Sequence, residues 1–467
     1  MDYDIIIIGS GPGGYVAAIR ASQLKMKVAV VERAELGGIC LNWGCIPTKS
    51  LLKSAQVFEY LTHASDYGIT ISGEIKPDFN AIIARSRNVA NGMSKGVQFL
   101  FKKNNIEHIK GFGRLAGINK AEVEVEVEAP DGTRKKYSSG NVILATGARS
   151  KELPNLKQDG KKIIGYREAM TLEKLPGSMV VVGSGAIGSE FANFYQSLGT
   201  NVTLVEFLPR VVPVEDEEVS KQMERSFRKI GMKVMTGSSV EAVDATKDKC
   251  QVTIKTPKGQ EIVEADIVLS AVGITTNIEN IGLEKAGVKT DKGKVVVDDF
   301  YRTSVPGIFA IGDIVHGPAL AHVASAEGII CVEKIAGIDV EPLDYKNIPG
   351  CTYTTPEIAS CGLTEAAARE AGYDIKVGKF PFTASGKASA SGAKDGFVKL
   401  IFDATYGELL GAHMIGANVT EMIAEIVVAR RLETTAHELI KAVHPHPTMS
   451  EAIMEAAAAA YGEVIHL

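Results

Sequence analysis

Two cysteines, Cys40 and Cys45, are the residues whose type and spacing most directly suggest chemistry. Four residues separate them in the glycine-rich stretch Leu36–Lys49. Thiols at this separation can close to a disulfide within one loop or helical turn, so the spacing predicts a redox-active dithiol. Zinc would need further Cys or His ligands at similarly close spacing, but the other four cysteines are scattered, so no metal site is predicted. Two plain buried cysteines are the remaining alternative.

A glycine fingerprint precedes the cysteine pair. An apolar run leads into Gly9, Gly11 and Gly14, and a helix-compatible segment follows. Such glycines permit a tight turn, a close approach of the backbone to a pyrophosphate and close helix packing, while the helix N-terminus offers N–H groups to the anion. The next apolar strand ends at Glu32, whose carboxylate can accept hydrogen bonds from an adenosine ribose.

The same arrangement occurs a second time, at Gly183, Gly185 and Gly188, followed by an apolar strand that ends at Glu206. Subtraction gives 183 − 9 = 174 for the first glycine and 206 − 32 = 174 for the acid. Two ordinary strand–helix turns are the alternative, but they would not need to share this spacing. Since one dinucleotide needs only one such unit, two units predict two dinucleotides, most simply FAD and NAD(P).

The end of the second unit bears on the choice between NAD and NADP. Glu206 and the uncharged Phe207 would repel a 2′-phosphate rather than bind it, which favours NAD. Arg210, four residues beyond Glu206, is a nearby cation that would act against this preference. The alternative interpretation of Glu206 is a solvated acid at the end of a strand.

Three further apolar strands end in glycine corners, at residues 142–147, 267–273 and 308–313. Their order predicts an α/β fold of two Rossmann-like dinucleotide-binding domains, the second inserted in the first. The remainder, from about Tyr345, is strand-rich and then helical and has no nucleotide fingerprint, so we expect a C-terminal α+β dimerisation domain there. The predicted boundaries are 1–148 for the first part of the FAD domain, 149–274 for the NAD domain, 275–344 for the second part of the FAD domain, and 345–467 for the dimerisation domain.

Composition narrows the class of protein. The chain has 467 residues, 45% of them hydrophobic, and a formal net charge of −5, so nothing favours nucleic acid as a partner. No apolar stretch is long enough to cross a membrane, and no charged segment of the signal-peptide type precedes the first apolar run. A cytoplasmic, reducing compartment is therefore expected, in which a functional disulfide would be catalytic and would cycle.

Two motifs carry a resemblance to a known family. The segment 37–49, Gly-Gly-Ile-Cys-Leu-Asn-Trp-Gly-Cys-Ile-Pro-Thr-Lys, and the segment 444–451, His-Pro-His-Pro-Thr-Met-Ser-Glu, resemble those of the pyridine nucleotide-disulfide oxidoreductases, most closely the members that oxidise dihydrolipoamide. The resemblance implies that His446 is the general acid/base, that Glu451 orients it, and that the His446–Pro447 bond is cis. Imidazole is well suited to take a thiol proton near neutral pH.

The resemblance also assigns cofactor contacts. It implies that Lys49 lies at the flavin ring, with Glu190 as its ion-pair partner, and that Asp313 lies at the ribityl chain. The other implied FAD contacts are Gly9, Gly11, Gly14, Glu32, Gly113, Thr146, Gly147, Ala319, Leu320, Ala321 and His322. The other implied NAD contacts are Gly183, Gly185, Gly188, Glu206, Val240 and Gly273. After Gly273 the chain has Ile274 and Thr275 where many relatives have Arg-Pro, which departs from the family pattern.

The resemblance implies oxidation of protein-bound dihydrolipoamide with NAD as hydride acceptor. Cys40 would exchange with substrate, Cys45 would face the flavin, and His446 would come from the other subunit of a homodimer. The implied partner is a lipoyl-bearing acyltransferase or a glycine-cleavage carrier protein, with no nucleic acid and no membrane. In relatives that use glutathione, basic residues are expected in place of Glu206-Phe207. In mercuric reductases, a further cysteine pair is expected near the C-terminus, but this chain has no cysteine beyond Cys361. Transhydrogenases, or a catalytically silent structural flavoprotein, would lack some of these reactive residues.

Overall fold

The computed structural model describes residues 1–119 and 122–467, which form two compact units. The first unit contains residues 1–50, 83–151 and 274–343, and the second contains residues 51–82, 152–273 and 344–467. The domain boundaries expected from the sequence stay a prediction. Within the described residues, no helix combines the length and the apolar character needed to cross a membrane.

The sheet of the first unit positions the first glycine fingerprint. Its strands follow the order β3-β2-β1-β6-β5-β4, and β19 pairs with β6. Strands β1, β2, β3 and β19 run parallel to the end of β6, whereas β4 and β5 extend the sheet in antiparallel fashion. The strands are β1 (Tyr3–Ile8), β2 (Val28–Glu32), β3 (Glu107–Lys110), β4 (Phe112–Asn119), β5 (Glu122–Glu128), β6 (Arg134–Leu144) and β19 (Ile308–Ala310).

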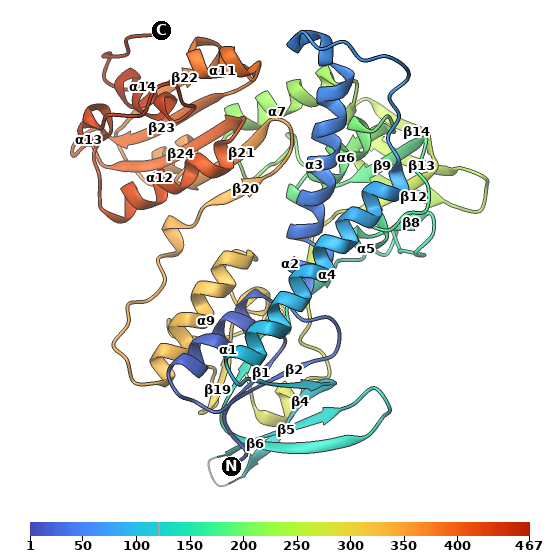
Figure 1. Ribbon diagram of the computed structural model, residues 1–467, viewed down its shortest axis with the longest axis vertical. Helices are drawn as coiled ribbons and strands as arrows, with labels where there is room; N and C mark the ends of the chain where they lie inside the picture. The colour runs from blue at the N-terminus through green and yellow to red at the C-terminus, as the bar shows by residue number, and fades with distance from the viewer. Residues whose placement is uncertain (120–121) are drawn as a thin grey trace. The chain divides into compact units, whose positions relative to one another are not determined.

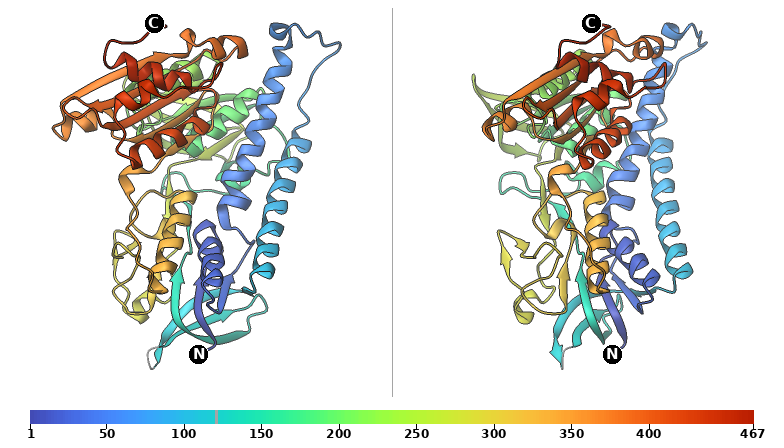
Figure 2. Two further views of the ribbon diagram at one scale, coloured as in Figure 1. Left: turned by 60° about the vertical axis from the view of Figure 1, so that its left-hand side comes forward. Right: turned by 90° about the vertical axis from the view of Figure 1, so that its left-hand side faces the viewer.

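The four isoleucines of β1 are buried on both faces of this sheet, as expected of a parallel central strand. Ile5 and Ile7 belong to a core cluster with helix α1 (Pro12–Gln23) and helix α9 (Ala321–Ile335), whereas Ile6 and Ile8 belong to a cluster on the opposite face. Helices α1 and α9 lie side by side in Figures 1 and 2. The remaining elements of this unit are the strand pair β7 (Ala148–Ser150) and β16 (Ile274–Thr276), the strand pair β17 (Thr290–Asp291) and β18 (Lys294–Val295), α8 (Leu283–Ala286) and η2 (Gly312–Ile314).

Three successive helices of the chain lie at the cysteine pair, and the first two of them contain the cysteines. Helix α2 covers Gly38–Trp43, α3 covers Cys45–Thr62 and α4 covers Phe79–Lys103. Gly37, with φ +95°, precedes α2, and Gly44 separates α2 from α3. The sequence predicts a loop or one helical turn for this stretch. The structure instead has two successive helices, with one cysteine in each.

A second parallel sheet, in the order β11-β10-β9-β15-β8, carries the second fingerprint. Its elements are β8 (Ile163–Ile164), α5 (Tyr166–Ala169), β9 (Ser178–Val182), α6 (Ala186–Ser197), β10 (Asn201–Val205), α7 (Glu217–Lys229), β11 (Lys233–Met235) and β15 (Ile267–Ser270). An antiparallel sheet follows it, with β12 (Ser239–Asp244), β13 (Cys250–Thr256) and β14 (Gly259–Ala265). Both predicted nucleotide-binding units thus have the expected strand–turn–helix form.

The C-terminal part of the second unit is an antiparallel sheet, in the order β20-β21-β24-β23-β22, covered by helices. Its strands are β20 (Gly350–Thr352), β21 (Glu357–Gly362), β22 (Ile375–Pro381), β23 (Phe397–Asp403) and β24 (Leu409–Gly416). Its helices are η3 (Tyr345–Asn347), α10 (Glu365–Glu370), η4 (Phe382–Ala384), α11 (Gly386–Ser391), α12 (Val419–Arg431), α13 (Ala436–Lys441) and α14 (Glu451–Ala459), and η1 (Ala64–Tyr67) belongs to the same unit. The predicted fold class, two dinucleotide-binding folds with a C-terminal α+β domain, is confirmed.

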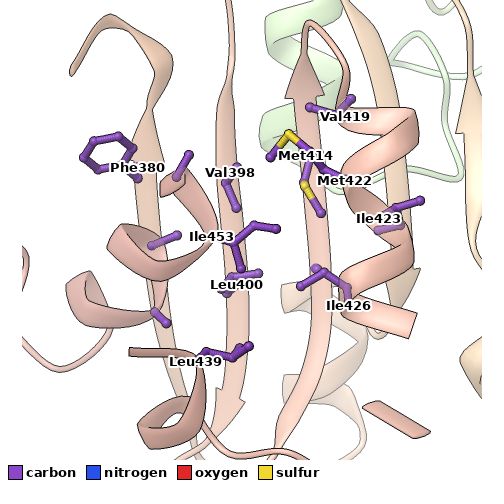
Figure 3. Packing of buried hydrophobic residues seen from close by; sticks show 14 of the residues in the cluster. Phe380, Val398, Leu400, Met414, Val419, Met422, Ile423, Ile426, Leu439 and Ile453 are labelled. Carbon is purple, nitrogen blue, oxygen red and sulfur yellow. The ribbon is translucent and has the colours of Figure 1, made fainter. Parts of the chain in front are cut away.

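Alternate residues of β23 face two different environments. Val398 and Leu400 pack against α14 in the apolar cluster shown in Figure 3, to which α12 also contributes. Between them, Lys399 points to the other face and is 2% exposed. Its Nζ lies 3.0 Å from Asp216 Oδ1 and 2.8 Å from Glu365 Oε2. Because a buried ammonium needs such partners, this cluster fixes α10 and the start of α7 against the sheet.

A stability prediction follows from Glu215, which adjoins this buried cluster. Burial and the neighbouring Asp216 raise the pKa of Glu215 to about 7, although a hydrogen bond with Ser360 opposes the shift. The unfolded chain loses this proton near the ordinary value of 4.5, so stability should fall as the pH rises from about 4.5 to 7. Glu215→Gln should remove this loss and be more stable above pH 7, by roughly 3 kcal/mol.

Urea unfolding of wild type and Glu215→Gln at pH 5 and pH 8 measures this difference. Glu217→Gln is the matched control, because Glu217 lies on the same turn but its side chain is 61% exposed. It should show no comparable gain at pH 8. Parallel pH profiles for wild type and Glu215→Gln would contradict the assignment.

Candidate active site

The two candidate redox cysteines lie in contact within the first unit. Cys40 belongs to α2, and Cys45 is the first residue of the 18-residue helix α3. A hydrogen bond between the two thiols, together with burial, raises the pKa of Cys40, while the charge of Lys49 acts in the opposite direction. The N-terminus of a long helix favours negative charge, so α3 suits Cys45 to the role of a thiolate.

The first fingerprint leaves space for a ligand at one of its three glycines. Gly9 has φ +106°, and a Cβ there would lie 2.1 Å from the carbonyl oxygen of Ala145. A Cβ at Gly14 would lie 1.9 Å from the carbonyl oxygen of Gly9, so both positions require glycine for packing. A Cβ at Gly11, which precedes α1, would meet no protein atom within 4 Å. The open side of this turn therefore fits a pyrophosphate at the helix N-terminus.

The second fingerprint repeats this geometry in the second unit. A Cβ at Gly183 would lie 2.5 Å from the carbonyl oxygen of Ala271, and one at Gly188 would lie 1.9 Å from that of Gly183. A Cβ at Gly185, before α6, would again meet no protein atom within 4 Å. The residues present therefore fit a second dinucleotide.

The acids at the strand ends hold the two fingerprint turns in the same way. Glu32 Oε2 accepts hydrogen bonds from the Ser10 backbone N–H at 2.9 Å and from Ser10 Oγ at 2.8 Å. Glu206 Oε2 accepts from the Ser184 N–H at 2.8 Å and from Ser184 Oγ at 2.7 Å. Neither serine was predicted from the sequence, although 184 − 10 = 174 repeats the spacing of the glycines. The repeat itself was the signal that could have identified them.

A substitution at Gly185 should separate dinucleotide binding from folding. Gly185→Ala places a methyl group in space that no protein atom occupies, and the φ of −62° at this residue suits alanine. We expect unchanged thermal stability and flavin content, with NADH binding weakened at least about tenfold by loss of the close pyrophosphate approach. Titration of NADH binding by fluorescence and a thermal melt measure the two quantities. Undiminished affinity would show that this turn does not face the nucleotide.

The other FAD candidates lie in the first unit. Asp313 is in η2 at the end of β19, and burial raises the pKa of its carboxyl, against the effect of Lys294. Because this carboxyl is buried, it needs hydrogen-bond partners, and hydroxyl groups of a ligand at this edge of the sheet could donate to it. Thr146 and Gly147 follow β6, and Thr146 Oγ1 donates to the Asn277 carbonyl at 2.7 Å. Lys49 is in α3 and Gly113 is in β4. Ala319 and Leu320 precede α9, and Ala321 and His322 are its first two residues.

The other NAD candidates lie in the second unit. Glu190 is buried in α6, and its Oε1 accepts a hydrogen bond from the Tyr353 backbone N–H at 3.0 Å. Its predicted ion pair with Lys49 stays a prediction. Val240 is buried in β12, and Gly273 follows β15 with φ +109°. The Cβ position of Gly273 is open, since a Cβ there would meet no protein atom within 4 Å.

The proposed acid/base pair is formed in the second unit. His446 Nδ1 lies 2.8 Å from Glu451 Oε1, and Glu451 Oε2 accepts the Thr448 backbone N–H at 2.7 Å. Burial opposes ionisation of Glu451, but these two hydrogen bonds outweigh it and lower its pKa. The carboxylate thus fixes one ring nitrogen and leaves Nε2 for a substrate proton. The His446–Pro447 bond is cis, as the resemblance implies.

The neighbouring His444 has a different partner. Its Nε2 lies 2.8 Å from Glu425 Oε1, and its Nδ1 lies 3.0 Å from the Ala442 carbonyl oxygen. The hydrogen bond to Glu425 is the main cause that raises the pKa of His444. Since both ring nitrogens are engaged within the chain, His444 is not the candidate base.

A half-buried dithiol, two sites that fit dinucleotides and a carboxylate-oriented histidine define a disulfide oxidoreductase that uses two nucleotide cofactors. Residues 3–328 match the pyridine nucleotide-disulphide oxidoreductases, and residues 348–457 match the dimerisation domain of that family. The chain belongs to the pyridine nucleotide-disulphide oxidoreductase family, so FAD and NAD are its cofactors, as the sequence predicts. The matched dimerisation domain supports a homodimer.

Individual relatives extend over the whole chain. Dihydrolipoyl dehydrogenases of Rhizobium etli and Zymomonas mobilis are each 50% identical to it, and each comparison covers 99% of both chains. Among solved structures, LpdA from Mycobacterium tuberculosis superposes with a TM-score of 0.90 at 29% identity, covering 97% of this chain and 98% of that one. The resemblance predicted from the two motifs is therefore confirmed.

Proposed function

We propose that this protein oxidises protein-bound dihydrolipoamide to lipoamide and passes the electrons through FAD to NAD. The observation that carries the proposal is the contact between the Cys40 and Cys45 thiols at the start of α3. A pair that can open and close is what exchange with another dithiol requires. The full-length similarity to dihydrolipoyl dehydrogenases supports the choice of substrate.

In the proposed reaction, one substrate thiol gives its proton to His446 Nε2, and the resulting thiolate attacks Cys40. The Cys40–Cys45 bond breaks, and Cys45 leaves as a thiolate. The second substrate thiol then attacks the mixed disulfide, so lipoamide leaves and Cys40 becomes a thiol with that second proton. The substrate has lost two electrons and the enzyme disulfide has gained them. FAD, when bound, supplies the route by which these electrons reach NAD.

We further propose that Glu451 acts by orientation. Because its carboxylate holds His446 Nδ1, the ring presents Nε2 to the substrate thiol in a fixed tautomer. In this proposal His446 of one subunit serves the cysteine pair of the other, so the dimer is required for the complete site.

The choice of NAD rather than NADP is supported by the end of β10. Glu206 holds a negative charge there, with Oε1 accepting the Leu208 N–H at 2.8 Å and Oε2 accepting from Ser184. A 2′-phosphate would be repelled by this carboxylate. The nearest candidate cation, Arg210, directs Nη2 to the Pro213 carbonyl at 3.4 Å.

The proposed physiological partner carries the lipoyl group on a flexible arm. We infer a lipoyl-bearing acyltransferase of a 2-oxo acid dehydrogenase complex, or the carrier protein of a glycine-cleavage system. The expected compartment is the cytoplasm, because a cysteine pair that cycles between dithiol and disulfide works in a reducing environment.

Steady-state turnover with dihydrolipoamide and NAD tests the proposal, compared with NADP, glutathione and mercuric ion under the same conditions. Dihydrolipoamide with NAD should give the highest kcat/KM. Faster turnover with glutathione and NADP would reject this substrate and leave the fold and the dithiol chemistry standing.

A further inference from the structure

One turn of α4, residues 85–87, contacts both helices that carry the reactive cysteines. The Arg87 Nη2 group donates a hydrogen bond to the backbone carbonyl of Asn42. The same guanidinium lies over the indole ring of Trp43, 4.3 Å from the ring centroid, in cation–π geometry. Asn42 and Trp43 are two of the four residues between Cys40 and Cys45. Arg87 therefore holds the C-terminal end of α2.

Adjacent residues of α4 hold the beginning of α3. Ser86 is fully buried, and its Oγ donates to the Pro47 carbonyl at 2.9 Å. Arg85 Nη1 donates to both the carbonyl oxygen and Oγ of Ser50 at 2.8 Å. Three consecutive residues of one helix thus fix the two short segments on either side of Gly44.

The chain on the α2 side has little freedom to rearrange around Arg87. The Asn42 side chain is buried, and its Nδ2 donates to the Leu36 and Gly38 carbonyls, both at 2.9 Å. Trp43 Nε1 reaches Glu35 Oε2 at 3.4 Å. With Asn42 and Trp43 held from the α2 side, Arg87 connects this framework to α4.

We propose that Arg87 and Ser86 are positioning residues that set the separation of the Cys40 and Cys45 sulfurs and thereby the equilibrium between dithiol and disulfide. A disulfide forms only when the two Cβ atoms lie about 3.5–4.5 Å apart. The Cys40 and Cys45 thiols are in hydrogen-bond contact, so holding α2 and α3 in place favours the closed form over the open dithiol. Neither side chain is assigned a contact with substrate, so each acts through the backbone it holds.

The proposal deepens the proposed function and rests on its dithiol–disulfide cycle, but its test does not depend on the identity of the substrate. The purified holoenzyme is equilibrated with thiol–disulfide buffers of known ratio, quenched by alkylation, and the fraction of Cys40–Cys45 disulfide is measured by mass. Dihydrolipoamide–NAD turnover is recorded in parallel.

Arg87→Met should reduce the equilibrium constant for disulfide formation about tenfold, a shift of about 30 mV. Arg87→Lys retains the charge and one donor, so it should fall between wild type and Arg87→Met. Lys95→Met, an exposed position on the same helix, is the matched control and should match wild type. If Arg87→Met acted only by lowering the stability of the fold, Arg87→Lys would not be expected to restore the equilibrium toward the wild-type value.

Ser86→Ala keeps the proposal testable if Arg87→Met does not fold. It removes only one hydroxyl, and it should shift the equilibrium about threefold in the same direction, since one hydrogen bond to α3 is lost. An equilibrium within about 1.5-fold of wild type in Ser86→Ala, or in folded Arg87→Met, would overturn the proposal. If the wild-type enzyme turns over dihydrolipoamide slowly while the variants shift the equilibrium as expected, the substrate assignment fails and the positioning role stands.

Discussion

Cys45→Ser should lower dihydrolipoamide–NAD turnover by about 10³-fold or more, because a serine oxygen cannot close a disulfide with Cys40. The NADH-dependent reduction of ferricyanide should continue, since hydride exchange between NADH and the flavin requires neither sulfur. Steady-state assays of both reactions on the same preparation, with equal flavin content, give the comparison.

Cys40→Ser is the matched variant for the assignment of unequal roles. It should be equally inactive with dihydrolipoamide, but it retains the thiol at the start of α3. A long-wavelength thiolate-to-flavin absorbance should therefore persist in Cys40→Ser and be absent in Cys45→Ser. The reverse pattern would exchange the roles of the two cysteines.

His446→Gln should reduce kcat/KM for dihydrolipoamide by about 10²- to 10⁴-fold, the usual contribution of a general base. The amide of glutamine cannot take the substrate proton, although it can still hydrogen-bond to Glu451. Activity at high pH should recover partly, because the substrate dithiol then ionises without help. Flavin content and NADH–ferricyanide activity should stay unchanged.

His444→Gln tests the rival position within the same motif. His444 is engaged by Glu425 and by the Ala442 carbonyl, so its substitution should leave most of the turnover in place. A larger loss in His444→Gln than in His446→Gln would transfer the acid/base role to His444.

The dinucleotide-binding turns could be predicted from the sequence because their determinants are local and occur twice. Gly9 and Gly183 occupy equivalent turns, and the serine that follows each of them binds the acid at the next strand end. The cysteine pair could also be predicted from the sequence, since only four residues separate its members. The division of this stretch into two helices could not be predicted, because the contacts on either side of Gly44 come from α4, a distant segment of the chain.

Long-range polar contacts could not be predicted from the sequence. Lys399 interrupts an apolar strand and would pass for a solvated charge, yet its partner Asp216 lies 183 residues away in the chain. Arg87 likewise resembles an ordinary surface residue of an amphipathic helix until α4 is packed against Asn42. In both cases the pairing arises only when separate segments of the chain meet.

The side chain of His446 is 77% exposed in a single chain, although its ring is already oriented by the contact with Glu451. In the proposed arrangement, this oriented but exposed ring is one part of the active site, and the cysteine pair of a second copy is the other. Two defective chains should then complement each other. Mixed dimers of Cys45→Ser and His446→Gln subunits contain one site with both lesions and one site with neither, so co-expression should restore activity that neither variant has alone.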